Sequence, residues 1–124
     1  MDPHHIIITS KKITARILQD LCQNTFGDMV KVVVDVEKCR IGIGGELHAD
    51  AEEMLIHNGS SPEDLWGANF YPWHEPDDRI EYSALINIRP RQDNASLEIL
   101  DSAIRERMKK IIEDVIMGPD ERLV

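Results

Sequence analysis

Several features that assign a protein to a familiar class are missing from this chain of 124 residues. No apolar run approaches the roughly 18 residues that a membrane-spanning helix needs. The N-terminus has Asp2 where a secretory signal has basic residues, and the apolar run 6–8 that follows is too short for such a signal. We therefore expect a protein with no membrane partner that stays in the cytoplasm.

Paired cysteines and the common catalytic motifs are also missing. Cys22 and Cys39 lie too far apart in sequence for a CxxC metal knuckle or redox centre, and we expect two reduced thiols. The glycines at 42–45 do not complete a dinucleotide-binding loop, and there is no P-loop, GxSxG elbow, HExxH zinc motif or EF-hand. Whether the protein is an enzyme stays open.

Basic residues are nearly absent from the middle of the chain. Between Ile41 and Ile88 there are ten acidic residues and a single base, Arg79, whereas the rest of the chain has thirteen of each. This stretch therefore accounts for the whole net charge of −9, and it also holds both tryptophans and both tyrosines. Its negative field repels phosphate, which argues against a nucleic-acid partner and favours cations or basic surfaces. Alternatively, the acids only keep the domain soluble.

The composition that remains is typical of one globular domain, with 42% apolar and 30% charged residues. We predict a single domain over residues 1–118 and a short tail over 119–124, with the last five residues frayed.

The apolar periodicity predicts eight elements in the order β-α-β-β-α-β-β-α. They cover residues 6–9, 11–25, 30–36, 41–46, 50–58, 65–71, 79–89 and 101–117. This order indicates an α+β fold, a two-layer sandwich with a mostly antiparallel sheet of about five strands. The first strand–helix–strand unit could add one parallel pair. The long alternation over 79–89 predicts one long strand.

The densest polar motif is GGELHAD, at residues 44–50. If the preceding strand continues through His48, then Glu46 and His48 project from the same face. A carboxylate and an imidazole so placed could bind a divalent metal or act as an acid–base pair, with Glu81 or His74 as a third ligand. Alternatively, His48 only donates to Glu46 or to a backbone carbonyl.

A second motif, DLWGANFYP, occupies residues 64–72 and reads as a strand. Trp66 and Phe70 share one face, which we expect to be core and not a stacking platform. Asn69 and Tyr71 share the other face and are candidates for the wall of a polar pocket.

The third motif, INIRPRQDN, occupies residues 86–94. Asn87 and Arg89 lie on the polar face of the predicted strand 79–89, and the Arg89 guanidinium could grip a carboxylate or phosphate. It could equally pair with a nearby acid. If this strand pairs antiparallel with the strand 65–71, Glu81 lies close to Asn69 and Tyr71.

Together, the three blocks resemble the core of a family of short bacterial and archaeal proteins known as a domain of unknown function. The blocks are GGELHADAE, DLWGANFYP and INIRPRQDN. The likeness runs from about Phe26 to Ser96, and this chain has Asp93-Asn94 where the family has Gly-Asn. The resemblance implies a free-standing domain and attaches no activity to it.

We therefore predict a small-molecule- or cation-binding domain with a polar site on one sheet face. Its candidate residues are Glu46, His48, Asn69, Tyr71, Glu81, Asn87 and Arg89. The candidate cofactor is a divalent metal held by Glu46 and His48. The alternative is a protein-interaction or homo-oligomeric module that uses the acidic, aromatic middle and exposes Trp66, Phe70 or Trp73.

Overall fold

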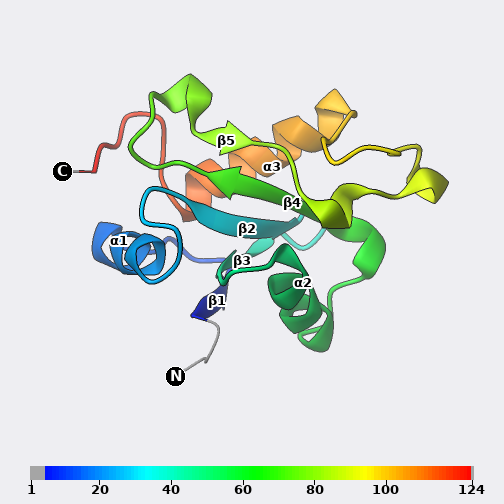
Figure 1. The fold of residues 1–124 in the computed structure, drawn as a ribbon, viewed down its shortest axis with the longest axis horizontal. Helices are drawn as coiled ribbons and strands as arrows, with labels where there is room; N and C mark the ends of the chain where they lie inside the picture. The colour runs from blue at the N-terminus through cyan, green and yellow to red at the C-terminus, as the bar shows by residue number, and fades with distance from the viewer. Residues whose placement is uncertain (1–4, 124) are drawn as a thin grey trace.

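The computed structural model describes residues 5–123, which form a five-stranded sheet with helices on both faces (Figure 1). The elements are β1 (Ile6–Thr9), α1 (Ala15–Gln23), β2 (Val30–Asp35), β3 (Arg40–Gly44), α2 (His48–His57), β4 (Leu65–Phe70), β5 (Ile80–Glu81) and α3 (Ser102–Val115). Short 3-10 helices are η1 (Pro62–Asp64), η2 (Pro76–Asp78), η3 (Leu85–Asn87) and η4 (Pro90–Gln92). The predicted α+β class is confirmed. None of the described helices is both long and apolar enough to cross a membrane.

The sheet has the strand order β1-β3-β2-β4-β5, and every neighbouring pair is antiparallel. The parallel pair considered possible for the first strand–helix–strand unit does not form. The reason is that β3 folds back from β2 as a hairpin and takes the position beside β2, so that β1 pairs with β3, with Ile7 opposite Ile43.

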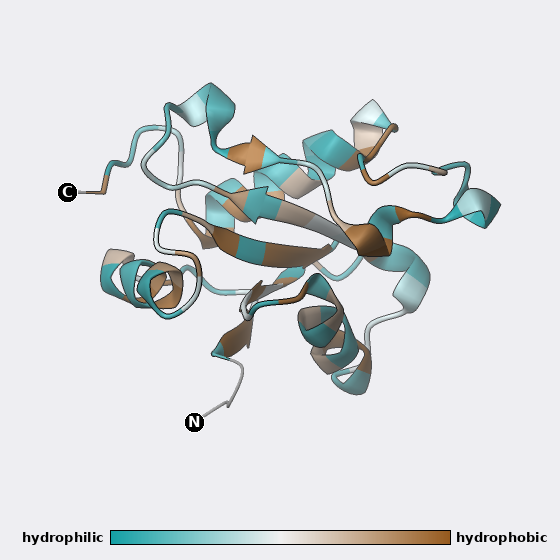
Figure 2. Cartoon of the chain, in the orientation of Figure 1, coloured by the Kyte–Doolittle hydropathy of each residue, from teal (hydrophilic) through white to brown (hydrophobic). Residues whose placement is uncertain are grey.

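Helices cover both faces of the sheet, which makes three layers in place of the predicted two. Val32 and Val34 pack with α1 and α3 in the larger core. Val33 points to the other face, where it packs with Ala51 and Leu55 of α2. Because both faces are buried in the middle of β2, residues 32–34 are three consecutive valines without alternation, part of the mostly brown strand in Figure 2.

The two helices on the larger core begin at side-chain caps. The Thr14 hydroxyl accepts from Ile17 N at 3.2 Å, so α1 begins later than the expected start after Ser10. For α3 the cap is Asp101, whose carboxylate accepts from Ala103 N at 2.8 Å, at the start of the predicted range 101–117.

The junction between β3 and α2 differs from the expected one. Gly44 has φ +109°, and a Cβ there would lie 2.1 Å from the carbonyl oxygen of His5, so the strand ends and the chain turns. The helix begins at His48 with Leu47 as its N-cap, which makes no side-chain capping bond. The strand therefore does not continue through His48, and the helix begins two residues before the predicted residue 50.

The predicted long strand over 79–89 is also wrong. Of this stretch only β5 (Ile80–Glu81) pairs with β4, and the chain then leaves the sheet. Residues 82–84 instead run antiparallel to residues 97–99, because Ala84 N donates to Leu97 O and Ile99 N donates to Tyr82 O.

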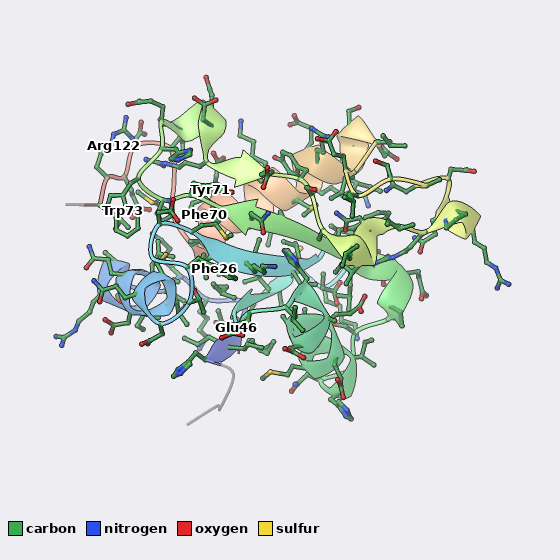
Figure 3. The ribbon with its side chains drawn as sticks, in the orientation of Figure 1. Phe26, Glu46, Phe70, Tyr71, Trp73 and Arg122 are labelled. Atoms are coloured by element: carbon green, nitrogen blue, oxygen red, sulfur yellow. The ribbon has the colours of Figure 1, made fainter. Side chains whose placement is uncertain are left out.

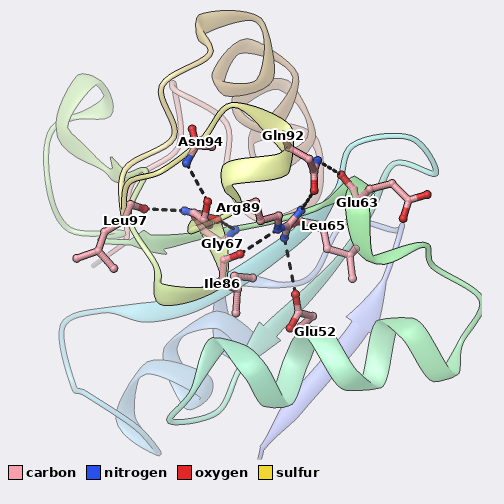
Figure 4. A network of polar contacts seen from close by, with 10 residues as sticks. Glu52, Glu63, Leu65, Gly67, Ile86, Arg89, Gln92, Asn94 and Leu97 are labelled. Carbon is pink, nitrogen blue, oxygen red and sulfur yellow. Dashed lines mark hydrogen bonds and ion pairs between the residues drawn. The ribbon is translucent and has the colours of Figure 1, made fainter.

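The edge of β4 that β5 leaves open is completed by side chains, and we call Asn87, Arg89 and Asn94 the edge clip (Figure 4). The Asn87 amide accepts from Gly67 N at 2.8 Å and donates to Gly67 O at 3.0 Å, as a strand would. Asn87 is fully buried and also donates to Leu97 O. Glycine is required at position 67, because a Cβ there would lie 2.6 Å from the Cβ of Ala84.

Arg89 extends the edge clip to the beginning of β4. Its guanidinium donates to the carbonyl oxygens of Leu65 and Ile86. The same group lies 4.6 Å from the centroid of the Trp66 ring and 3.7 Å from the Glu52 carboxylate. The internal pairing considered for Arg89 is therefore the one that forms.

Asn94 fixes the loop that carries the other two clip residues. Its amide nitrogen donates to three carbonyl oxygens, those of Asn87, Ser96 and Glu98. Asp93, just before it, has φ 58°, a left-handed conformation that Asp tolerates better than most residues. The turn therefore forms without the glycine of the family pattern.

Arg79, the one base of the acidic stretch, is 3% exposed. It donates to the carbonyl oxygens of His74, Gly118 and Glu121, and thereby holds the C-terminal segment. Leu123 packs against the larger core. The fraying expected for the last five residues is therefore not seen in the part of them that is described.

Both cysteines are free thiols, as predicted. Cys22 is buried in the core, and its burial, with a smaller contribution from Asp28, raises its thiol pKa to about 11. Cys39 is exposed in the turn between β2 and β3.

The edge clip yields a stability prediction. Asn87→Leu keeps the branched shape of the side chain but leaves the Gly67 N–H, the Gly67 carbonyl and the Leu97 carbonyl without their partner. We expect the free energy of unfolding in urea to fall by about 3 kcal/mol. The exposed neighbour Arg91→Leu is the control and should change it by less than about 0.5 kcal/mol. Equal stability of the two variants would show that the amide does not hold this edge.

Candidate functional site

One end of the sheet face under α2 is left uncovered by the helix. A row of polar side chains crosses three strands there, because Lys31 of β2 pairs with Asn69 of β4, and Asn69 pairs with Glu81 of β5. Residues paired across a sheet point to the same face. The row therefore lies on the same face as α2.

A hollow of about 340 Å³ opens beside this row. It lies between the beginning of α2, the strands β2 and β4, and the chain that follows β5. Its polar lining residues are Lys31, His48, Asn69 and Ser83, and its apolar ones are Leu47, Ala49, Ala84, Leu85 and Ile86. Loop and helix together thus form the walls, and the sheet forms the floor.

His48, the first residue of α2, is 7% exposed and lies in the wall of the hollow. Its Nε2 is 2.8 Å from the carbonyl oxygen of Ala68. A carbonyl only accepts, so in the neutral imidazole Nε2 carries the proton and Nδ1 is left as an acceptor. Burial lowers the pKa of His48, Lys31 lowers it further, and the partners Ala68 and Asn69 oppose this shift. We therefore take His48 as neutral at pH 7.

Asn69 has one half of its amide paired and the other half free. Its Nδ2 donates to Glu81 at 2.8 Å, which fixes the orientation of the amide because a carboxylate only accepts. Its Oδ1 is buried and has no hydrogen-bond partner among residues 5–123. The Tyr71 hydroxyl donates to the same Glu81 oxygen at 3.4 Å, and burial followed by Glu81 raises the pKa of Tyr71.

Lys31 supplies the positive charge of the hollow. Its Nζ lies 5.3 Å from the centroid of the Phe26 ring. In the described part of the chain, no carboxylate lies within 4.0 Å of this ammonium group. The hollow therefore combines one cation with two neighbouring acceptors, Nδ1 of His48 and Oδ1 of Asn69.

The seven predicted site residues separate into three groups. The first group lies together at the open end of the α2 face and comprises His48, Asn69, Tyr71 and Glu81. Asn87 and Arg89 form the second group, which belongs to the edge clip and is hydrogen-bonded to backbone groups of β4. Glu46 is exposed near the beginning of α2, well away from Tyr71 in Figure 3.

The expected metal pair of Glu46 and His48 does not form. Because β3 ends at Gly44, the two residues do not share a strand face, and Nε2 of His48 is bonded to a carbonyl. Of the third ligands considered, Glu81 bonds Asn69 and His74 stacks on Tyr71. Within residues 5–123, no three His, Cys, Asp or Glu side chains are grouped so as to hold a metal ion.

Lys31 and Ser83 belong to the hollow but are missing from the predicted site. A signal for Lys31 was available, because it is the one charged residue between apolar residues at the beginning of β2. Pairing that strand with 65–71 would have placed it beside Asn69.

A buried carboxylate at the far end of β2 has a structural role. Asp35 is fully buried and accepts from the backbone N–H groups of Glu37 and Lys38. Its other oxygen accepts from the Ser60 hydroxyl at 2.6 Å. These bonds tie the turn after β2 to the end of α2, and they leave Asp35 outside the hollow.

Fold and hollow together define a small α+β domain with one antiparallel sheet and a polar hollow beside the first turn of a helix. The family model described as "Protein of unknown function (DUF5674)" matches residues 6–115, so the chain belongs to this family. The resemblance inferred from the three sequence blocks is thereby confirmed. Comparison with curated proteins and with solved structures gave no match.

The buried His48 yields a pH prediction. Its pKa in the folded state lies below the reference value of 6.5. As the pH falls through 6.5, the unfolded chain therefore takes up a proton before the folded protein does, and stability is lost. We expect the free energy of unfolding to fall between pH 7 and pH 5.5 by at most about 1.4 kcal/mol per pH unit.

His48→Gln should flatten this dependence, as measured by urea unfolding across the same pH range. The exposed His57→Gln at the end of α2 is the matched control and should keep the wild-type slope. A slope that is identical in both variants and the wild type would contradict the assignment.

Proposed function

We propose that the protein is a small-molecule-binding domain and that its ligand occupies the hollow beside the first turn of α2. The observation that carries this proposal is the convergence of Lys31, His48 and Asn69, from three different elements, on one hollow. Apart from Ser83, the rest of the wall is apolar. Ligand sites in proteins typically combine such an apolar lining with a few placed polar groups.

Unused hydrogen-bonding capacity supports binding over a purely structural role. Buried polar atoms are nearly always paired in folded proteins. Here the Oδ1 of Asn69 is buried without a partner, while the other half of the same amide is fixed by Glu81. A ligand donor would complete this group.

A hollow of similar size, about 360 Å³, lies between β1 and α1. It is lined by four apolar residues and by His5, Asp20 and Asn24, and none of these side chains has a buried polar atom without a partner. It therefore offers less to recognise a specific ligand. The hollow at α2 is the better supported site.

The charges of the hollow favour a small molecule over a simple metal cation, because Lys31 repels a cation. We propose binding and not catalysis, since no hydrogen bond among the described residues joins Ser83 to His48 as nucleophile and base. A reaction at this site would need further groups from the ligand itself.

The interaction module remains the second candidate, and it now depends on Trp73. Trp66 and Phe70 are buried in the core, so they form no surface in the folded chain. Trp73 is 44% exposed. Light scattering coupled to size exclusion tests this candidate: a dimer that dissociates in Trp73→Ala would support it, and a wild-type monomer would contradict self-assembly.

A thermal-shift panel of metabolites and metal ions on untagged protein tests the proposed function, after elemental analysis of protein purified without chelator. A ligand at 100 times its Kd should stabilise the protein by about 2.7 kcal/mol. We expect the stabilisation to shrink strongly in Lys31→Met and to persist in Lys110→Met, an exposed lysine on α3. Equal stabilisation of both variants would place the site elsewhere.

A further inference from the structure

The polar row beside the hollow has opposite charges at its two ends. Lys31 lies at one end and Glu81 at the other, with the neutral amide of Asn69 between them. Adjacent strands are about 4.8 Å apart, so the two charged residues are separated by roughly 10 Å of sheet. A ligand that lies along this row meets a cation at one end and a carboxylate at the other.

The middle of the row offers two hydrogen-bond acceptors to a ligand. Asn69 presents its Oδ1, because its Nδ2 is held by Glu81. Neutral His48 presents Nδ1, because its Nε2–H is held by Ala68. An ammonium group has three donors and no acceptor, and it therefore matches the acceptors of Asn69 and His48.

The other end matches a carboxylate. Lys31 has no carboxylate of the described chain within 4.0 Å. The first turn of α2 begins beside it, and its N-cap Leu47 makes no side-chain capping bond. The positive end of the helix dipole adds to the attraction that Lys31 exerts on an anionic group.

The net charge of the protein decides between an anion and a zwitterion. A chain with a net charge of −9 repels a simple anion at long range. A simple cation is repelled by Lys31 inside the hollow. A zwitterion carries no net charge, and its carboxylate can face Lys31 while its ammonium group meets the acceptors in the middle of the row.

Resting on the function proposed above, we infer that the ligand is a free α-amino acid with an apolar side chain. Its carboxylate lies toward Lys31, and its ammonium group donates to Asn69 and His48 on the side of Glu81. Its side chain lies against Leu47 and Leu85, of which Leu85 is 77% exposed without a ligand. The hollow of about 340 Å³ has room for it.

Three compounds that share the same isobutyl group test this inference by calorimetric titration: leucine, 4-methylpentanoate, which lacks the amine, and 3-methylbutylamine, which lacks the carboxylate. We expect leucine, or a neighbour in a series from alanine to phenylalanine, to bind. Removal of either charged group should weaken binding roughly 10- to 100-fold.

Two variants assign each end of the ligand. Lys31→Met should remove the preference for leucine over 3-methylbutylamine, and Asn69→Leu should remove the preference for leucine over 4-methylpentanoate. Lys110→Met is the control and should leave both preferences unchanged. Circular dichroism and thermal melting check that each variant folds, and both substituted side chains are partly exposed.

The outcomes separate the inference from the proposed function. Loss of binding in Lys31→Met shows that a compound binds the hollow. If such a compound is the acid or the amine alone and it binds as tightly as the amino acid, the inference is overturned and the proposed function stands. The same holds if metabolites of another class bind while no amino acid does. If nothing in either panel binds, both are overturned.

Discussion

The pairing of the Asn87 amide with the backbone of Gly67 is the contact on which the rest of the molecule depends. It brings the chain after β5 flat against β4, at a distance that only glycine at position 67 permits. The same chain supplies Ser83 and Leu85 to the wall of the hollow. The contact that finishes the sheet edge therefore also builds the candidate site, although Asn87 itself touches no ligand position.

The positions of two basic side chains determine the charge of the hollow and of the acidic stretch. Arg79 is buried against carbonyl oxygens, so the acidic stretch has no exposed base of its own. Lys31 comes from outside that stretch and is brought in by the pairing of β2 with β4. The hollow therefore contains a positive charge in a chain whose net charge is −9, so that ligands can be selected by their charge distribution and not by their net charge alone.

The sequence was sufficient to predict the features that depend on local periodicity and cross-strand alternation. These include the five-stranded sheet, the core position of Trp66 and Phe70, and the approach of Asn69 and Tyr71 to Glu81. Prediction from the sequence failed where a side chain takes the place of a strand's backbone as hydrogen-bond partner. The alternation over 79–89 is real, but Asn87 satisfies the ladder through its amide, and no periodicity distinguishes the two cases. His48 was misplaced because the turn at Gly44 depends on the packing of β1, a contact distant in sequence.

The edge clip also controls how this sheet can meet other chains. A strand whose outer N–H and C=O groups are free can recruit an extended segment from a neighbouring molecule, which is a common route to aggregation. Along the first half of β4 those groups are already bonded to Asn87 and Arg89. Fibril-like growth from this edge therefore requires the clip to open first, and its rate is limited by a local unfolding step and not by encounter between molecules.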